Sequence, residues 1–328
     1  MRIPILAFSV LFVLFSTYAP ANGGMTSCYP LFTLDPSGAV AATQPFINAI
    51  NPCTNDTSAV YAPATKQFGT VVDFAVSSDQ QTCAILHLPS SAEWELAVVR
   101  LSTGEMLLRT GGSTSAWAWG SRVTYHPSDN LVAVGIHSTA LSGSDAAVWF
   151  VDLAAGGGGA LEADVPLECA WSPSWSPTGE RIAVAHVGQS SLCVLDAETL
   201  SVIYSFHPYG LCASRFGCCS QVEWSPDGNS LAFSDTSYAS EGIPLGIQAA
   251  DGQSLQAYRY DDWSLPDALC GSYRVRDFAW SPDSDWIAVL VTCFESGDQY
   301  VLALSVNSDT VEILCTPSEA HWLTRIDW

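Results

Sequence analysis

Positive charge is scarce in this chain. Eleven Lys and Arg residues stand against thirty-three Asp and Glu, and the formal net charge is −22. Lys66 is the single lysine. Nucleic acids and anionic membranes carry dense negative charge, so such a surface repels both. We therefore expect no nucleic-acid partner. The charge is compatible with basic partners or cations, but solubility alone is the favoured interpretation.

The chain also lacks the short motifs that mark common chemistry. Gly-x-Ser-x-Gly, His-Glu-x-x-His, Walker A and Gly-x-Gly-x-x-Gly are all absent from the sequence. The six histidines are scattered and form no ligand spacing. We therefore predict no catalytic residue, no cofactor and no metal site.

Long apolar runs are missing after the N-terminus, so no transmembrane span is expected. The run Ile3–Phe15 follows Arg2 and is too short to cross a bilayer comfortably. Ala19-Pro-Ala21 fits a small-x-small cleavage site. These features predict a cleaved signal peptide at 1–21 and a secreted or extracytoplasmic protein. An uncleaved anchor is the alternative.

Cysteine is plentiful, with eleven residues, all after the predicted signal peptide. In an exported protein most should form disulfides, and an odd number leaves one over. We predict that Cys28 pairs with Cys53, and that Cys212 pairs with Cys218 or Cys219. His207 with the last three cysteines is an alternative zinc set, but no Cys-x-x-Cys spacing supports it. Asn55-Asp-Thr57 is an N-glycosylation sequon.

A repeated phrase dominates the rest of the chain. Trp-Ser-Pro, a polar turn and an apolar strand occur together at Trp175–Val184, Trp224–Phe233 and Trp280–Val289. Weaker copies begin at Leu34, Val76 and Tyr125. Pro fixes the backbone angle φ at an early position of the turn, and Gly tolerates the positive φ with which the turn ends. One strand precedes the phrase, one follows it, and two more come before the next copy. Each unit therefore has four strands, as a β-propeller blade does.

The phrase resembles the WD40-like (PD40) repeat of TolB-type propellers, which also occurs in the propeller domains of prolyl-oligopeptidase-type peptidases. The resemblance covers nearly all of the chain after about residue 29. It implies an all-β fold, a β-propeller of six or seven four-stranded blades, spanning 22–328. The predicted blades are 29–70, 71–120, 121–170, 171–219, 220–275 and 276–322. Segment 323–328 either closes the ring on the first blade or opens a truncated seventh.

One strand position points to the centre of such a ring. Three residues before each anchor stand Leu31, Asp73, Arg122, Ser172, Gln221, Asp277 and Arg325. Period-two alternation puts them on one face with the residues directly before the anchors, Thr33, Ala75, Thr124, Ser174, Glu223, Ala279 and Asp327. We expect these strands to be innermost. Asp73 and Arg122 fall in consecutive units, as do Asp277 and Arg325, so pairing between blades is one interpretation.

A ligand site is the other interpretation of the same residues. It would use Asp73, Arg122, Gln221, Asp277 and Arg325 at the channel mouth. The sequence thus predicts a secreted binding or scaffolding module with a protein or small-ligand partner. Two enzyme hypotheses remain open: the propeller of a truncated prolyl-oligopeptidase-like peptidase, and a propeller glycan hydrolase that uses Asp73 and Asp277.

Overall fold

The computed structural model describes the parts of the chain that form its sheets. These are residues 31–35, 46–50, 57–61, 70–90, 93–113, 122–128, 130–136, 147–155, 160–163, 170–186, 191–206, 219–235, 245–252, 255–258, 273–293, 296–308, 310–315 and 325–327. The predicted signal peptide, Cys28, Cys53, Cys212, Cys218 and Asn55 lie outside these residues. Cys219 lies in a strand, but its side chain is not described. Cys83 is described and is a buried free thiol.

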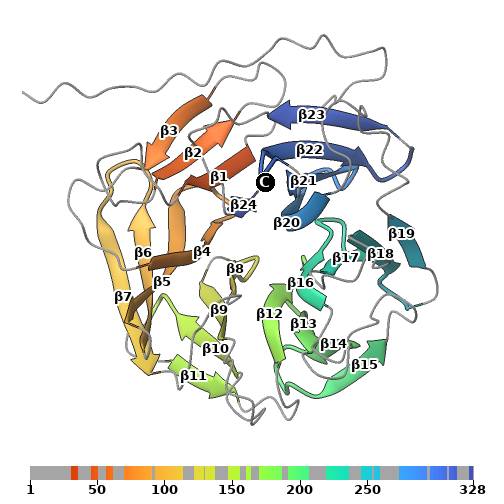
Figure 1. The fold of residues 1–328 in the computed structure, drawn as a ribbon. Helices are drawn as coiled ribbons and strands as arrows, with labels where there is room; N and C mark the ends of the chain where they lie inside the picture. Colours follow the sequence, from red (N-terminus) through yellow and green to blue (C-terminus); the bar gives the residue numbers. More distant parts are fainter. Residues whose placement is uncertain are drawn as a thin grey trace, which may run out of the picture.

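The described strands form six four-stranded antiparallel sheets that follow one another around a ring (Figure 1). The first sheet holds, in order, β24 (Arg325–Asp327), β1 (Leu31–Asp35), β2 (Phe46–Ile50) and β3 (Thr57–Tyr61). The second holds β4 (Thr70–Val76), β5 (Thr82–Ser90), β6 (Glu93–Arg100) and β7 (Met106–Ser113). The third holds β8 (Arg122–Tyr125), β9 (Leu131–Ile136), β10 (Ala147–Asp152) and β11 (Ala160–Ala163).

The other three sheets repeat this order of consecutive strands. The fourth holds β12 (Ala170–Trp175), β13 (Arg181–His186), β14 (Ser191–Asp196) and β15 (Val202–Phe206). The fifth holds β16 (Cys219–Trp224), β17 (Ser230–Asp235), β18 (Leu245–Ala249) and β19 (Leu255–Tyr258). The sixth holds β20 (Tyr273–Trp280), β21 (Trp286–Cys293), β22 (Gln299–Ser305) and β23 (Val311–Cys315). In the described part of the chain, no helix has the length and apolar character of a membrane span.

The first sheet corrects one expectation. We expected Leu31 and Thr33 on an innermost strand, but β24 takes that edge and β1 lies second. Arg325 is paired with Leu34, just as Asp73 is paired with Leu86 in the second sheet. A Pro-Ser-Gly turn predicts that a strand ends before it, but it does not predict which position in the sheet that strand takes. Within the segment 323–328, the described residues Arg325–Asp327 pair with the first sheet.

The repeated phrase closes the hairpin between the first two strands of a unit. In its clearest copy, the Ser225 hydroxyl donates to Oδ1 of Asp227 (2.6 Å) and accepts from the N–H of Ser230 (2.9 Å). Ser77 and Ser281 make the same two bonds in their own turns. These bonds satisfy backbone and side-chain groups that the turn leaves out of the ladder, which explains why Ser and Asp recur together.

The turns also share one residue with positive φ, and this gives a stability prediction. Gly228 has φ +74°, whereas Gln80 takes the same place at φ +56°. Changing Gln80→Gly should raise the free energy of unfolding by about 0.5 kcal/mol, because relief of a left-handed conformation (about 1–2 kcal/mol) exceeds the entropy cost of glycine (about 0.5–1 kcal/mol).

Gly228→Ala is the converse variant. A Cβ there lies 3.5 Å from the Pro177 ring, an ordinary contact, so only the backbone is strained. The expected loss is about 1 kcal/mol. Urea denaturation measures both variants, and equal stability in the two would contradict this account of the turns.

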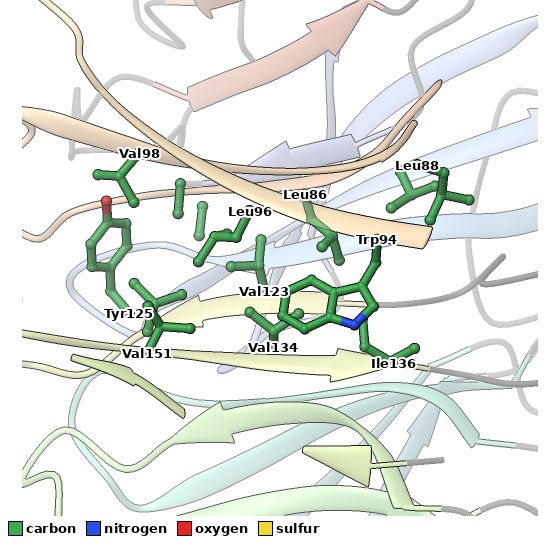
Figure 2. Close-up of a cluster of buried hydrophobic side chains, with 14 residues drawn as sticks. Leu86, Leu88, Trp94, Leu96, Val98, Val123, Tyr125, Val134, Ile136 and Val151 are labelled. Atoms are coloured by element: carbon green, nitrogen blue, oxygen red, sulfur yellow. The ribbon is translucent and has the colours of Figure 1, made fainter. Parts of the chain in front are cut away.

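The hydrophobic core is divided among the interfaces between neighbouring sheets, and each of the six interfaces has its own cluster of buried side chains. Figure 2 shows the cluster between the second and third sheets, where Leu86 and Leu96 face Val123 and Val134. The first sheet takes part in two interfaces. Leu31 and Ile326 pack against the sixth sheet, and Phe32 packs against the second. Each sheet is thus held mainly by its two neighbours.

His87 in β5 is buried and gives a pH-dependence prediction. Burial, and then the nearby charge of Arg109, lower its pKa from 6.5 to about 4. Its Nε2 is 3.6 Å from Glu95, which is itself paired with Arg109. Between pH 6.5 and 4, His87 is protonated in the unfolded chain but stays neutral in the folded chain. His87 therefore has no effect on the pH dependence above pH 6.5 and lowers stability by about 3 kcal/mol as the pH falls to 4.

The measurement is urea denaturation of wild type and His87→Leu from pH 7.5 to 4. Other acidic groups titrate in both proteins, so the difference between the two curves isolates His87. We expect the variant to lose less stability on acidification than the wild type. Parallel curves would show that His87 keeps an ordinary pKa in the folded protein.

Candidate functional site

The innermost strands bring together four of the five predicted site residues. Asp73 (β4), Arg122 (β8), Gln221 (β16) and Asp277 (β20) are buried, with 3%, 8%, 7% and 0% of their surface exposed. Arg325 lies in β24, and its side chain is not described. Four polar side chains from four different sheets can be this buried together only if they satisfy one another.

Arg122 is the centre of this cluster. Its Nη1 donates to Oδ1 of Asp277 (2.8 Å) and lies 3.5 Å from Oδ1 of Asp73. Its Nη2 donates to Oε1 of Gln221 (2.8 Å). Burial disfavours the charged guanidinium, but Asp277 and Asp73 outweigh burial, and the pKa of Arg122 is raised.

The expected pairing between consecutive units is therefore observed for Asp73 and Arg122, and the expected pairing of Asp277 with Arg325 lies outside the described side chains. Asp277 pairs with Arg122, which comes from three sheets away along the chain. Strand register places residues around the axis of a ring, but it does not tell how far a side chain reaches across it. An arginine is long enough to contact a strand on the opposite side.

Several of these polar side chains also bond to the next innermost strand. Oδ2 of Asp73 accepts from the N–H of Val123 (2.7 Å), and Oδ2 of Asp277 accepts from the N–H of Ile326 (2.8 Å). The same relation joins other neighbours: Ser172 to Val222 N–H, Ser174 to Trp224 N–H, Gln221 to the Phe278 carbonyl, and Asp327 to Val76 N–H. These bonds satisfy backbone groups on the inner edge of the ring.

The bonding of Asp73 and Asp277 bears on the hydrolase hypothesis. Both oxygens of each carboxylate accept from Arg122 or from a backbone N–H. A catalytic carboxyl group must instead have an oxygen within hydrogen-bond reach of the substrate atom that gains or loses the proton. The arrangement suits sheet-to-sheet bonding better than acid–base chemistry.

A cavity of about 80 Å³ lies among the innermost strands. Its lining includes Asp73, Arg122, Gln221, Glu223 and Asp327. Among the described residues, no group of three His, Cys, Asp or Glu side chains is placed to hold a metal ion. The cavity is therefore bounded by a rigid polar ring whose groups are mostly committed to one another.

Glu223 (β16) is one exception, beside Nε of Arg122, and the sequence did not single it out. Its Oε2 is inaccessible to solvent and accepts no hydrogen bond within the described residues. Burial raises its pKa well above the ordinary value, and the charges of Asp327 and Asp277 add to this effect, with Arg122 opposing it. The signal in the sequence was available: Glu223 is the one glutamate in the set of residues directly before the anchors.

Comparison with known proteins gives the fold a name. No protein-family model and no curated protein matches the sequence. Among solved structures, TolB from Acinetobacter baumannii superposes with a TM-score of 0.63 at 13% identity, over 91% of this chain and 65% of that chain. A chain of the nidogen/laminin complex gives 0.60 at 8% identity, over 91% and 97%. The β-propeller domain of Cps50 (Swd1) from Myceliophteria thermophila gives 0.54 at 12%, over 86% and 84%.

The chain is a β-propeller. The all-β propeller prediction is thereby confirmed. At these identities the likeness concerns the fold alone, and the chain spans only 65% of the length of TolB. In a propeller the innermost strands surround one axis, which accounts for the meeting of residues far apart in the sequence. Arg122 and Asp277 are 155 positions apart, and Val76 and Asp327 are 251 apart.

Proposed function

We propose that this propeller is a binding or scaffolding module that recognises a partner at the end of its central ring, where the cavity opens. The observation that carries the proposal is the cavity itself, which is lined by polar side chains from several innermost strands. A cavity on which a few polar groups converge is typical of a binding site.

The partner is most simply a protein. The nidogen/laminin structure is a complex that contains a propeller of similar fold, which supports this choice by analogy only. A rigid ring with loops at its ends suits recognition without catalysis. The finer parts of the proposal are a TolB-type (PD40) repeat family with six blades, secretion after cleavage at Ala21, disulfides among the N-terminal and 212–219 cysteines, and a glycan at Asn55. These parts rest on the sequence.

The test blocks the opening of the cavity without touching the buried cluster. Thr124 lines the cavity and is half-buried, so Thr124→Tyr places a larger side chain at the mouth. Partners are recovered by cross-linking from the medium of cells that secrete the tagged protein. Only proteins captured in larger amounts than with an empty bait count as partners.

We expect Thr124→Tyr to abolish capture of the principal partner while the melting temperature stays near that of wild type. Ile203→Tyr, at an exposed position of the outermost strand β15, is the control and should capture normally. Loss of capture in the control alone would move the binding surface to the outer rim and overturn the proposal.

A further inference from the structure

One end of the sixth sheet is fastened by a covalent bond. Cys293, the last residue of β21, is 1% exposed and forms a disulfide. Cys83 and Cys193 keep their thiols, so neither is its partner. The partner is therefore a cysteine whose side chain is not described. The places of these cysteines along the chain and its strands decide among them.

Cys315 lies too far from Cys293 to be the partner. It ends β23, and β22 separates β23 from β21. Two strand spacings amount to about 9.5 Å, whereas the Cα atoms of a disulfide lie at most about 7 Å apart. The register adds to this distance, because the residue of β21 in line with Cys315 is Leu290.

The cysteines next to the fourth and fifth sheets are separated from Cys293 by other strands. Cys169 directly precedes β12 of the fourth sheet, and the fifth sheet lies between that sheet and the sixth (Figure 1). Cys219 begins β16, which contacts β20 of the sixth sheet, so β20 stands between β16 and β21. Cys212 and Cys218 are the predicted partners in that part of the chain.

The N-terminal cysteines belong to the other end of the ring. Cys28 precedes β1 and Cys53 follows β2, at the end of the first sheet where Leu31 pairs with Ile50. Because β1 and β21 are both the second strands of their sheets, the start of β1 corresponds to the start of β21. Cys293 is the last residue of β21 and therefore lies at the opposite end.

Cys270 is the cysteine that the chain holds nearest to Cys293. Tyr273 begins β20 and is directly opposite Cys293, so their Cα atoms are about 5 Å apart. Cys270 comes only a few residues before Tyr273. Three residues of chain reach at most about 11 Å, which covers the span that a disulfide to Cys293 requires.

We infer that Cys270 and Cys293 form a disulfide that fastens the entry to β20 onto the end of β21. The bond forms by exchange with a donor disulfide, such as oxidised glutathione. One S–S bond forms between the two cysteines, the S–S bond of the donor breaks, and the two cysteine protons pass to the two thiols that the donor becomes. The inference does not depend on the cavity, so it and the proposed function can each fail alone.

The bond would support the polar ring. β20 carries Asp277, which pairs with Arg122 and accepts from the N–H of Ile326. A link between Cys270 and Cys293 closes a loop that contains Asp277, and it therefore lowers the entropy of the unfolded chain across this hairpin. Because Cys293 is buried, a reductant reaches the bond only when the sixth sheet opens.

The first experiment is peptide mapping of the full chain, isolated without reductant from the medium of secreting cells. Thiols are blocked with N-ethylmaleimide, and pepsin then cleaves the chain at acid pH, where disulfides do not exchange. We expect one linked pair of peptides with Cys270 and Cys293, and labelling of Cys83 and Cys193 only in urea. A peptide that joins Cys293 to any other cysteine, or label on Cys293 itself, would overturn the inference.

The second experiment measures urea unfolding of Cys270→Ala, Cys293→Ala and the double variant. Cys270→Ala should raise the equilibrium constant of unfolding at least about thirtyfold. The double variant should match Cys293→Ala, because one substitution already removes the bond. Additive losses would contradict a shared disulfide. Should a variant fail to fold, the peptide map of the wild type decides alone.

A reductant supplies the matched control. Dithiothreitol should lower the urea midpoint of the wild type more than that of the double variant, which has no bond here to lose. Cys83→Ala also removes a buried cysteine, but Cys83 is not in a disulfide, so this variant should respond to dithiothreitol as the wild type does. Equal responses of the wild type and the double variant would overturn the inference.

Discussion

Arg122→Met is expected to lower the free energy of unfolding by about 3–5 kcal/mol, because it leaves buried carboxylates without their cation. Asp277 is fully buried, and Arg122 is its ion-pair partner within the described residues. Asp73 and Gln221 lose a donor at the same time. Methionine fills much of the same space, so the loss comes from charge and hydrogen bonding rather than from a cavity. Urea denaturation at pH 7 measures the change.

Two further variants separate the cluster from general effects of removing arginine. Arg109→Met is the matched control, because Arg109 is half-exposed and pairs with Glu95 at the surface, and it should cost less than about 1 kcal/mol. The double variant Arg122→Met with Asp277→Asn removes both charges and keeps an acceptor for the N–H of Ile326. It should be more stable than Arg122→Met alone by at least about 1 kcal/mol. Additive losses would mean that the two residues do not act as one unit.

Ile326→Ala is expected to cost about 2–5 kcal/mol, a large effect for a residue in a three-residue strand. Ile326 is 5% exposed and packs with Leu31 and Leu290 at the interface between the first and sixth sheets. Its N–H also donates to Asp277. The variant therefore weakens both the apolar interface and the seating of β24 on the inner edge of the ring.

The control is Ile203→Ala in β15, where the side chain is 45% exposed on an outermost strand. It should change stability by no more than about 0.5 kcal/mol. Limited proteolysis adds a second readout: Ile326→Ala should expose the first sheet to cleavage sooner than wild type does. Equal stability of the two alanine variants would show that β24 contributes little to the ring.

Much of the fold follows from the repeated phrase. The turn depends on adjacent residues alone, as Ser225, Pro226 and Asp227 show. The hairpins after β12, β16 and β20 were therefore predictable from sequence. The inward face was predictable as well, because period-two alternation fixes which side of a strand Asp73 and Gln221 share. Local rules suffice wherever the same short-range interaction recurs in each unit.

The first sheet was not predictable in the same way. Its innermost strand comes from the other end of the described chain, and pairing of Leu34 with Arg325 is decided by the closure of the ring. Contacts across the axis are also beyond local rules, as the bond between Arg122 and Asp277 shows. Glu223 was missed for a third reason: its state depends on burial and on charges from other sheets, which no pattern within β16 encodes.

The most direct test of this account is the titration of the Glu223 carboxyl group itself, followed by its ¹³C shift in protein labelled at glutamate and assigned with Glu223→Gln. The account predicts a midpoint well above that of an ordinary glutamate, because the carboxyl group is buried and lies near the charges of Asp327 and Asp277. An ordinary midpoint would contradict a Glu223 carboxyl group held in the interior of the ring, away from water.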